Sequence, residues 1–405
     1  MRLILNSLSS VLPNLCSDSM IYVHIPFCRS FCTYCDFYSE VAPRCPKAED
    51  VTRQSVLFET FADALSKEFV AHSEEVSKDV NTLYIGGGTP SVLPLSAFAR
   101  LLDTFRSRGH GGPYDEFTIE VNPEDIVEKG RAYAEGLLEL GVNRISMGVQ
   151  SFDDDILRFM NRRHDAAAAR VAYGILEDAG FENISIDLIF GLPQLSDAVW
   201  RDTLKRAMDI SAKGVLPKHV SSYQLSVEPG SALAGLVERG LWTEASEDLC
   251  RGQYDILCDV LGDAGYHHYE ISNFALPGYE ARHNSAYWKH VPYLGLGPGA
   301  HSLALSDSGK PVRRWNAQNL HAYIADPLSV SEGEELTEGQ VVLERVMLGL
   351  RTSEGLAEEY LLRHCDATRL EQHLSSGDIV RTSFGTLRIP ESRFFVSDAI
   401  ISSLV

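Results

Sequence analysis

Short apolar runs alternate with segments of helical periodicity along the first 235 residues of the chain. Each run is brief and rich in β-branched residues, as expected of a strand that is buried on both faces. Between the runs, apolar residues recur every three or four positions, as Phe58, Phe61, Leu65 and Phe69 do. Repeated strand–helix units predict a parallel sheet with covered faces, here an α/β fold with an incomplete (β/α)6 barrel. The predicted strands are residues 21–25, 82–85, 117–121, 144–149, 184–190 and 219–225.

Polar residues and glycines collect where these predicted strands end, the edge where barrels of this kind hold their functional groups. Three cysteines follow the first strand, and a run of three glycines follows the second. Carboxyl, amide and guanidinium residues follow or interrupt the later strands. One rim of the barrel is therefore the predicted functional site. Its candidate residues are Cys28, Cys32, Cys35, Gly86, Gly87, Gly88, Thr89, Glu120, Gln150, Arg162 and Asp187.

The spacing C-x3-C-x2-C of Cys28, Cys32 and Cys35 is typical of ligands to a 4Fe-4S cluster. Three thiolates leave one iron without a protein ligand, and an open metal position can take a substrate. A disulfide framework is disfavoured because the chain is long and its eight cysteines are not spread as a scaffold. A zinc site is disfavoured because no second cysteine pair follows at zinc spacing. The cysteines therefore predict an iron–sulfur cluster.

The glycine run Gly86-Gly87-Gly88 favours close approach of the backbone to a ligand. Residues without Cβ leave room for the ligand, and exposed N–H groups can bind its polar parts. The run is not a P-loop, because no Gly-Lys-Ser/Thr follows. A simple tight turn is the alternative interpretation, and the run alone does not separate the two.

Four polar side chains at the later strand ends have chemical reasons to be ligand groups. Glu120 can accept two hydroxyl hydrogens, although a salt bridge or a helix-end charge is the alternative. Gln150 ends an apolar strand, where an amide is costly without a partner. Arg162 can grip a carboxylate with two bonds, whereas its neighbour Arg163 fits a solvated surface charge. Asp187 interrupts an apolar strand, where an acid is expensive unless it is paired.

Composition and charge bear on three questions: whether the protein binds nucleic acid, whether it spans a membrane and where in the cell it lies. The net charge of −20 argues against a nucleic-acid partner, because phosphate backbones are bound by basic surfaces. No apolar run reaches the roughly 18 residues that a membrane span needs. Residues 1–19 have a broken apolar pattern and are predicted to be a disordered leader. The cysteine usage fits a reducing compartment, so the predicted location is the cytoplasm.

The cysteine spacing resembles the radical S-adenosylmethionine (SAM) superfamily, in which the open iron binds SAM and the reduced cluster releases a 5′-deoxyadenosyl radical. The motifs YVHIPFC, CTYCDF, GGGTPS, EVNPE, GVQSF, NRRH and DLIFGLPQ resemble the oxygen-independent coproporphyrinogen III oxidase family. The resemblance runs from about residue 20 to the C-terminus. It implies a 4Fe-4S cluster, SAM and an electron donor such as flavodoxin or ferredoxin. It also implies that SAM lies against Tyr22, Tyr34, Gly86, Gly87, Gly88, Thr89, Glu120, Gln150, Arg162 and Asp187.

One position departs from the oxidases. The cysteine motif of the oxidases is C-x3-C-x2-C-x-C, whereas this chain has Phe37 at the position of the fourth cysteine. The CDF ending resembles the HemW branch of the family, whose members are described as haem chaperones. The segment His283–Trp288 resembles the HNxxYW motif of that branch, which implies haem contact through His283, Tyr287 and Trp288. Without the resemblance, these residues fit core packing and a satisfied polar group.

The remaining segments complete the predicted domain organisation. Residues 20–235 form the predicted radical SAM barrel core, and residues 236–330 a linking segment that carries the HNxxYW motif. Residues 331–405 show three short helices, a hairpin over 379–389 and a last helix, which predict a C-terminal winged-helix-like domain. Its 7 basic and 13 acidic residues disfavour DNA binding.

We therefore expect a radical SAM-type protein that binds haem and passes it to haem-accepting proteins. Three alternatives stay open: a working coproporphyrinogen III oxidase, a radical SAM methyltransferase, and a binding protein whose cluster is only structural. The missing fourth cysteine argues against the oxidase. Whether the chain is an enzyme is left undecided by the sequence.

Overall fold

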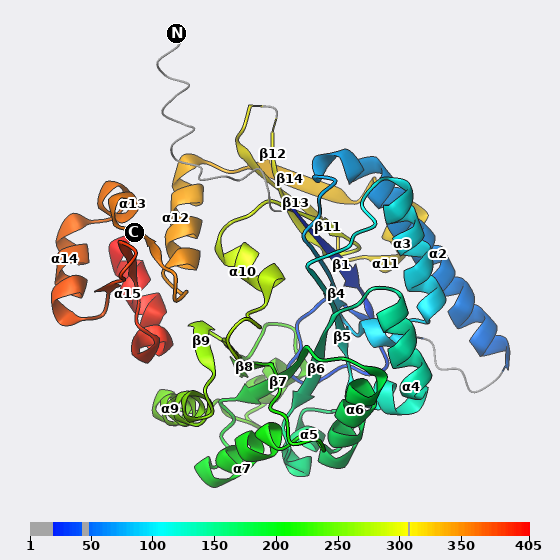
Figure 1. Cartoon of the computed structure of the whole chain (residues 1–405), viewed down its shortest axis with the longest axis horizontal. Helices are drawn as coiled ribbons and strands as arrows, with labels where there is room; N and C mark the ends of the chain where they lie inside the picture. The colour runs from blue at the N-terminus through cyan, green and yellow to red at the C-terminus, as the bar shows by residue number, and fades with distance from the viewer. Residues whose placement is uncertain (1–18, 43–47, 307) are drawn as a thin grey trace.

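The computed structural model describes residues 19–42, 48–306 and 308–405. Within these ranges the largest element is a twelve-stranded sheet in the order β14-β13-β12-β11-β1-β4-β5-β6-β7-β8-β10-β9 (Figure 1). Its central six strands are parallel and adjacent in chain order. The sheet does not close on itself, so the predicted incomplete (β/α)6 barrel is confirmed. The six strands are β1 (Met20–Ile25), β4 (Thr82–Gly87), β5 (Glu116–Val121), β6 (Arg144–Gln150), β7 (Ile184–Phe190) and β8 (His219–Gln224).

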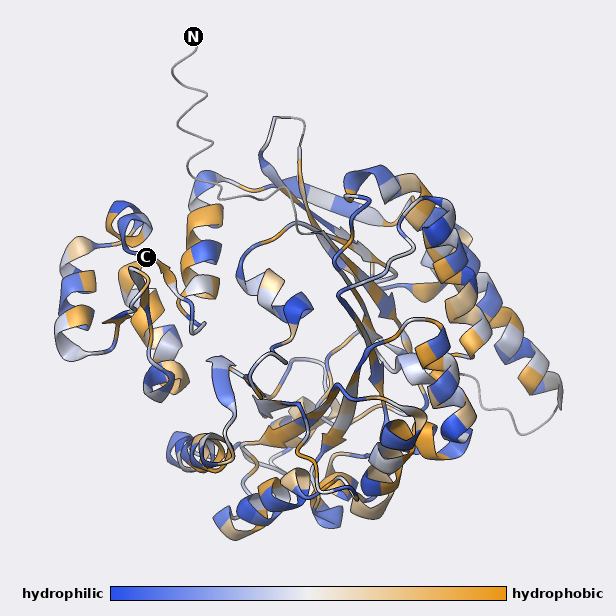
Figure 2. Cartoon of the chain, in the orientation of Figure 1, coloured by the Kyte–Doolittle hydropathy of each residue, from blue (hydrophilic) through white to orange (hydrophobic). Residues whose placement is uncertain are grey.

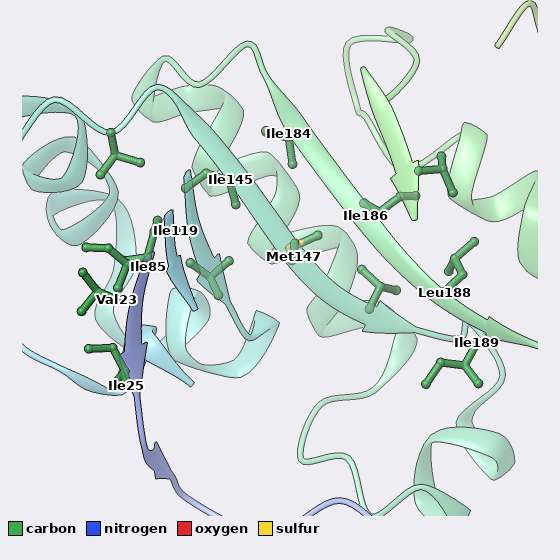
Figure 3. Close-up of a cluster of buried hydrophobic side chains, with 14 of the residues drawn as sticks. Val23, Ile25, Ile85, Ile119, Ile145, Met147, Ile184, Ile186, Leu188 and Ile189 are labelled. Carbon is green, nitrogen blue, oxygen red and sulfur yellow. The ribbon is translucent and has the colours of Figure 1, made fainter. Parts of the chain in front are cut away.

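Helices cover the outer face of this curved sheet (Figure 1). Apolar strand residues such as Ile119, Ile145 and Met147 are fully buried beneath them (Figure 3). Figure 2 shows hydrophobic strands in the sheet and helices that carry both hydrophobic and hydrophilic residues. Burial of this layer supplies the main driving force for folding. The covering helices are α2 (Ala48–His72), α3 (Leu95–Ser107), α4 (Pro123–Glu139), α5 (Asp154–Phe159), α6 (Ala166–Ala179), α7 (Asp197–Met208) and α9 (Glu247–Asp263).

The opposite, inner face of the same strands is polar. Side chains alternate between the two faces of a strand, so Ile145 and Met147 point outward while Arg144, Ser146 and Gly148 point inward. The inward set lines a cavity inside the barrel. This alternation is what places polar groups at a buried site.

Later segments of the chain lengthen the sheet at both ends. β11 (Tyr293–Leu296) pairs in parallel with β1, and three antiparallel strands follow it. The predicted linking segment therefore contributes strands to the barrel sheet, and the predicted domain boundaries stay predictions. The other strands are β9 (His267–Glu270), β10 (Asn273–Ala275), β12 (His301–Leu305), β13 (Pro311–Asn316) and β14 (Ser331–Glu335).

The C-terminal segment has the predicted order of elements. Helices α12 (Glu338–Gly349), α13 (Glu358–His364) and α14 (Ala367–Ser376) precede a hairpin, in which Val380 pairs with Arg388. A capping box between Thr337 and Gln340 begins α12. A last helix closes the segment. The remaining elements are β15 (Leu356–Ala357), β16 (Val380–Arg381), β17 (Thr386–Arg388), α15 (Ser397–Leu404), β2 (Phe27–Cys28), β3 (Glu40–Val41), α8 (Ala232–Glu238), α10 (Arg282–Trp288), α11 (Leu320–Ala325), and the 3-10 helices η1 (Ser73–Glu75), η2 (Pro90–Val92) and η3 (Glu391–Val396).

Two further sequence predictions concern a disordered leader and the lack of a membrane span. The predicted leader covers residues 1–19, of which 1–18 lie outside the described residues. Across the described ranges, none of the helices combines the length and the hydrophobicity that a bilayer crossing needs.

Candidate functional site

A cavity of about 730 Å³ opens where the parallel strands end. Loops after β1, β4, β5, β6 and β8 contribute to its wall, so the predicted rim exists as one site. Of the predicted residues, Tyr22, Gly86 and His283 are absent from the described lining. The predicted residues that do line it are Cys28, Cys32, Tyr34, Cys35, Gly87, Gly88, Thr89, Glu120, Gln150, Arg162 and Asp187.

The cysteine loop is held in place by neighbouring segments. The backbone N–H of Thr33 donates to the Met160 carbonyl at 3.2 Å, and the Thr33 carbonyl accepts from the N–H of Leu233 at 2.8 Å. The side-chain amide of Asn161 donates to the Phe31 carbonyl at 2.6 Å. The irregular loop thus takes its shape from the ends of two other barrel units.

The three thiols are free and face the same cavity. Cys28 Sγ lies 3.5 Å from Thr89 Oγ1, and a guanidinium nitrogen of Arg162 lies 3.5 Å from Cys32 Sγ. Among the described residues, no three cysteine, histidine or acidic side chains converge closely enough to hold a single metal ion. Three separate thiols beside a cation fit a multi-iron cluster, in which each thiolate binds a different iron.

The glycine run lies directly against the cysteine loop. A Cβ on Gly88 would approach the Phe27 carbonyl oxygen to 2.8 Å and Cys28 Sγ to 3.1 Å. The N–H groups predicted to bind a ligand are already used, because those of Gly88 and Thr89 donate to the Ile25 and Phe27 carbonyls. The prediction of exposed donors is therefore wrong here. The run supplies space beside the cluster loop instead.

Arg162 is the more deeply placed of the two adjacent arginines. One of its nitrogens donates to Asn122 Oδ1 and to the Gly148 carbonyl, both at 2.6 Å. Its Nε is buried and has no partner. Arg163 instead lies 3.8 Å from Glu124 with 35% of its side chain exposed. The geometry separates the two residues as the sequence suggested.

Glu120 and Asp187 are carboxyl groups whose pKa values are raised toward neutral pH by their surroundings. Burial raises the pKa of Glu120 to about 7, even though the Tyr84 hydroxyl at 2.7 Å and the Gly87 N–H at 3.0 Å favour its ionised form. Burial raises the pKa of Asp187 to about 6, against hydroxyl hydrogen bonds that include Ser146 at 3.1 Å. Groups that titrate near neutral pH inside a cavity are typical of functional sites.

Gln150 holds a strained backbone at the cavity wall. Its φ of 68° lies in the left-handed region, and a register shift interrupts the β6–β7 pairing beside it. A residue with a Cβ pays roughly 1–2 kcal/mol for this conformation. Such strain is found where a side chain must be aimed at a ligand.

The structure does not bring Tyr22, Gly86 and His283 to the cavity. The Tyr22 hydroxyl bonds His24 Nδ1 at 3.0 Å, and Gly86 packs behind the Glu120 carboxyl. His283 is 1% exposed and uses both ring nitrogens, with Thr82 at 2.8 Å and with Tyr287 at 3.0 Å. Burial lowers the pKa of His283 to about 3. In this conformation the imidazole has no free nitrogen for a haem iron.

Several residues that line the cavity were not among the predicted ligand residues, although Asn122 was expected at the same rim because it ends the third predicted strand. Asn122 joins Arg162 to Thr89, since its amide nitrogen donates to Thr89 Oγ1 at 3.1 Å. Arg144 and Ser146 also line the cavity, on the inner face of β6. The signal was present in the strand RISMGVQ, because every second residue of it is non-aliphatic.

Comparison with known proteins agrees with this site. The Radical SAM superfamily profile matches residues 22–207. The "Heme chaperone HemW" of Lactococcus lactis is 35% identical over 340 residues, which cover 84% of this chain and 83% of that protein. The zebrafish "Radical S-adenosyl methionine domain-containing protein 1, mitochondrial" is 30% identical over 361 residues, 87% of this chain and 77% of that protein.

The fold has a close counterpart among solved structures. Coproporphyrinogen III oxidase (HemN) from Escherichia coli superposes with a TM-score of 0.75 at 22% identity, covering 98% of this chain and 92% of HemN. At this identity the likeness establishes the fold alone. The sequence similarity to HemW proteins goes further, and this chain belongs to the HemW family of the radical SAM superfamily.

Proposed function

We propose that this protein is a haem chaperone, which binds a 4Fe-4S cluster, SAM and haem and delivers haem to acceptor proteins. The proposal rests on its HemW relatives, which carry the name haem chaperone. Within the chain, the observation that carries it is Phe37. This residue lines the cavity at the position where the oxidase motif has a fourth cysteine. Its ring is 65% exposed.

The proposed cofactor roles follow from where the side chains lie. Cys28, Cys32 and Cys35 would hold the cluster, which when reduced can supply an electron to the sulfonium of SAM. Arg162, with its unpartnered Nε, would bind the SAM carboxylate near Cys32. Glu120 would accept hydrogen bonds from the ribose hydroxyls. Tyr34, Gly87, Gly88, Thr89, Gln150 and Asp187 would complete the contacts.

Haem would be the cargo, and the cavity mouth suits its chemistry. Phe31 and Phe37 both line the mouth and expose 52% and 65% of their surface. Exposed aromatic rings offer flat apolar faces to a porphyrin. The acceptor proteins, a flavodoxin or ferredoxin donor and the cytoplasmic location stay predictions, as does the absence of a nucleic-acid partner.

The test uses the anaerobically reconstituted protein. We expect titration with haem to give a shifted Soret band, and the loaded protein to transfer haem to apomyoglobin. We also expect no protoporphyrinogen IX from coproporphyrinogen III in the presence of SAM and a reductant. Product formation at a steady rate would restore the oxidase. Absence of any Soret shift would remove haem and leave the methyltransferase or a structural cluster.

A further inference from the structure

A buried guanidinium lies deep in the cavity, away from the cysteines. Arg144 is the first residue of β6, and its side chain lines the cavity although only 1% of the residue is exposed. Gly148, whose carbonyl accepts from Arg162, lies four residues further along the strand. At about 3.3 Å per residue, the backbone of Arg144 lies roughly 13 Å along β6 from Gly148, the residue that Arg162 contacts.

Among the described residues, the side chain of Arg144 has no hydrogen-bonded or ion-paired partner, although it lies near enough to Glu120 and Asp187 for its charge to favour their ionised forms. Its Nε is buried without a hydrogen bond, and no carboxylate of the described residues lies within ion-pair distance of its guanidinium. The two acids of the cavity are engaged elsewhere. Glu120 accepts from Tyr84 and Gly87, and Asp187 accepts from Ser146. A buried cation without a partner is costly, so the residue is expected to meet an anion.

The buried histidines near Arg144 accept no hydrogen bond from it. His219 is buried and uses its ring nitrogens with Ser185 and Tyr269, both at 2.8 Å. His283 is likewise saturated by its own partners. Thr118, the register partner of Arg144 on β5, has a buried hydroxyl oxygen without a partner. Two neighbouring strands thus leave unsatisfied polar atoms at one level of the barrel.

We propose that Arg144 anchors a carboxylate of a ligand held inside the barrel. A guanidinium binds a carboxylate through two parallel hydrogen bonds, which gives direction as well as affinity. Two ligands of the proposed function carry this group: haem has two propionates, and SAM has one carboxylate, which is assigned above to Arg162, so a haem propionate is the expected partner of Arg144. The choice of these ligands rests on the proposed function, whereas the site itself rests on the geometry of Arg144.

The experiment removes the carboxylate from the ligand and the guanidinium from the protein. Reconstituted wild-type protein is titrated with haem and haem dimethyl ester, and with SAM and decarboxylated SAM. The same four titrations are made on Arg144→Met and on Arg144→Lys. Arg170→Met, which changes an exposed arginine of α6, is the matched control. Iron content is measured for every variant.

We expect haem and haem dimethyl ester to differ in affinity by about 10- to 100-fold in wild type and in the control, and this difference to vanish in Arg144→Met, while the SAM pair keeps the preference set by Arg162. Coupling to haem alone assigns the propionate, and coupling to SAM alone assigns the methionyl carboxylate. A carboxylate preference that persists in Arg144→Met for both pairs overturns the proposal, as does its absence in wild type. If Arg144→Met fails to fold, Arg144→Lys decides, and an unchanged preference there also overturns it. Wild type that binds no haem refutes the proposed function, while the SAM pair still decides on Arg144.

Discussion

Two buried polar regions of the barrel use their hydrogen-bonding groups in opposite ways. In the cavity, Arg162 and Arg144 each keep an Nε without a partner, and the Glu120 carboxyl titrates near neutral pH. Around His283, both ring nitrogens and the backbone N–H are matched to Thr82, Tyr287 and Glu116. Both regions combine polar and aromatic residues. The comparison indicates that the side chains of a ligand site leave hydrogen-bonding atoms free for the ligand, whereas those of a structural cluster bond one another.

The largest effect should come from the cysteines. Serine at Cys28, Cys32 or Cys35 removes a thiolate ligand, so we expect complete loss of the visible cluster absorbance after anaerobic reconstitution. Cys250→Ser changes a buried thiol of α9 outside the cavity and should retain it. A full cluster in Cys28→Ser would contradict the assignment of the cavity as the cluster site.

The next largest effect should come from removing the guanidinium of Arg162, which lies beside the cysteine loop. We expect Arg162→Met to weaken SAM binding about 10- to 100-fold, because charged hydrogen bonds contribute roughly 1.5–3 kcal/mol. Calorimetry on the anaerobic protein measures it, with iron content as a check on the cluster. Arg170→Met, at an exposed position of α6 outside the cavity lining, is the control and should stay within about twofold. Equal affinities in both variants would remove Arg162 from the site.

A smaller effect is the pH dependence of SAM binding. The ionised Glu120 carboxylate accepts hydroxyl hydrogen bonds best, and its pKa of about 7 means that it gains charge as pH rises through neutrality. SAM affinity should therefore rise by up to about tenfold between pH 6 and pH 8. Glu120→Gln should flatten this rise. A pH profile that is the same in both proteins would exclude ionisation of Glu120 as its origin.

The smallest effect on binding is expected in the saturated region. His283→Ala leaves the buried hydroxyls of Thr82 and Tyr287 without partners, which should lower the free energy of unfolding by about 3 kcal/mol. Iron content and the affinities for SAM and haem should stay within about twofold of wild type. Urea unfolding and ligand titrations measure the two parts separately. A tenfold loss of haem affinity with iron content intact would contradict the structural role of the His283 region and support the predicted haem contact.

The barrel and most of its rim could be predicted because both follow local rules. Strand alternation and strand-end position placed Cys28, Glu120, Gln150 and Asp187 in one cavity. Arg144 escaped because an arginine at the start of a strand looks like a solvated end. The alternation of RISMGVQ, in which Arg144, Ser146 and Gly148 share one face, was the signal that places its side chain on the inner face.

Features that depend on distant pairing could not be predicted. His283 matched a motif, yet its role depends on Thr82, two hundred positions earlier, whose hydroxyl occupies one ring nitrogen. Strands β9 to β14 were also not predicted, because strands of only three to six residues have no strong pattern of their own. The direction of the glycine N–H groups likewise depends on which backbone lies opposite them.

The position of β1 has a consequence for how the protein is made. This strand carries the cysteine loop and lies between β4 and β11, with Met20 paired to both Thr82 and Tyr293. On the ribosome, the second neighbour of β1 emerges much later than β1 itself, because Met20 and its partner Tyr293 are 273 positions apart in the sequence. A nascent chain that ends before β11 exposes the edge of β1 and lacks the backing of the cluster loop. A cluster held by this loop would therefore gain its full support only after β11 has been synthesised, and the open edge of β1 is exposed to wrong pairing until then.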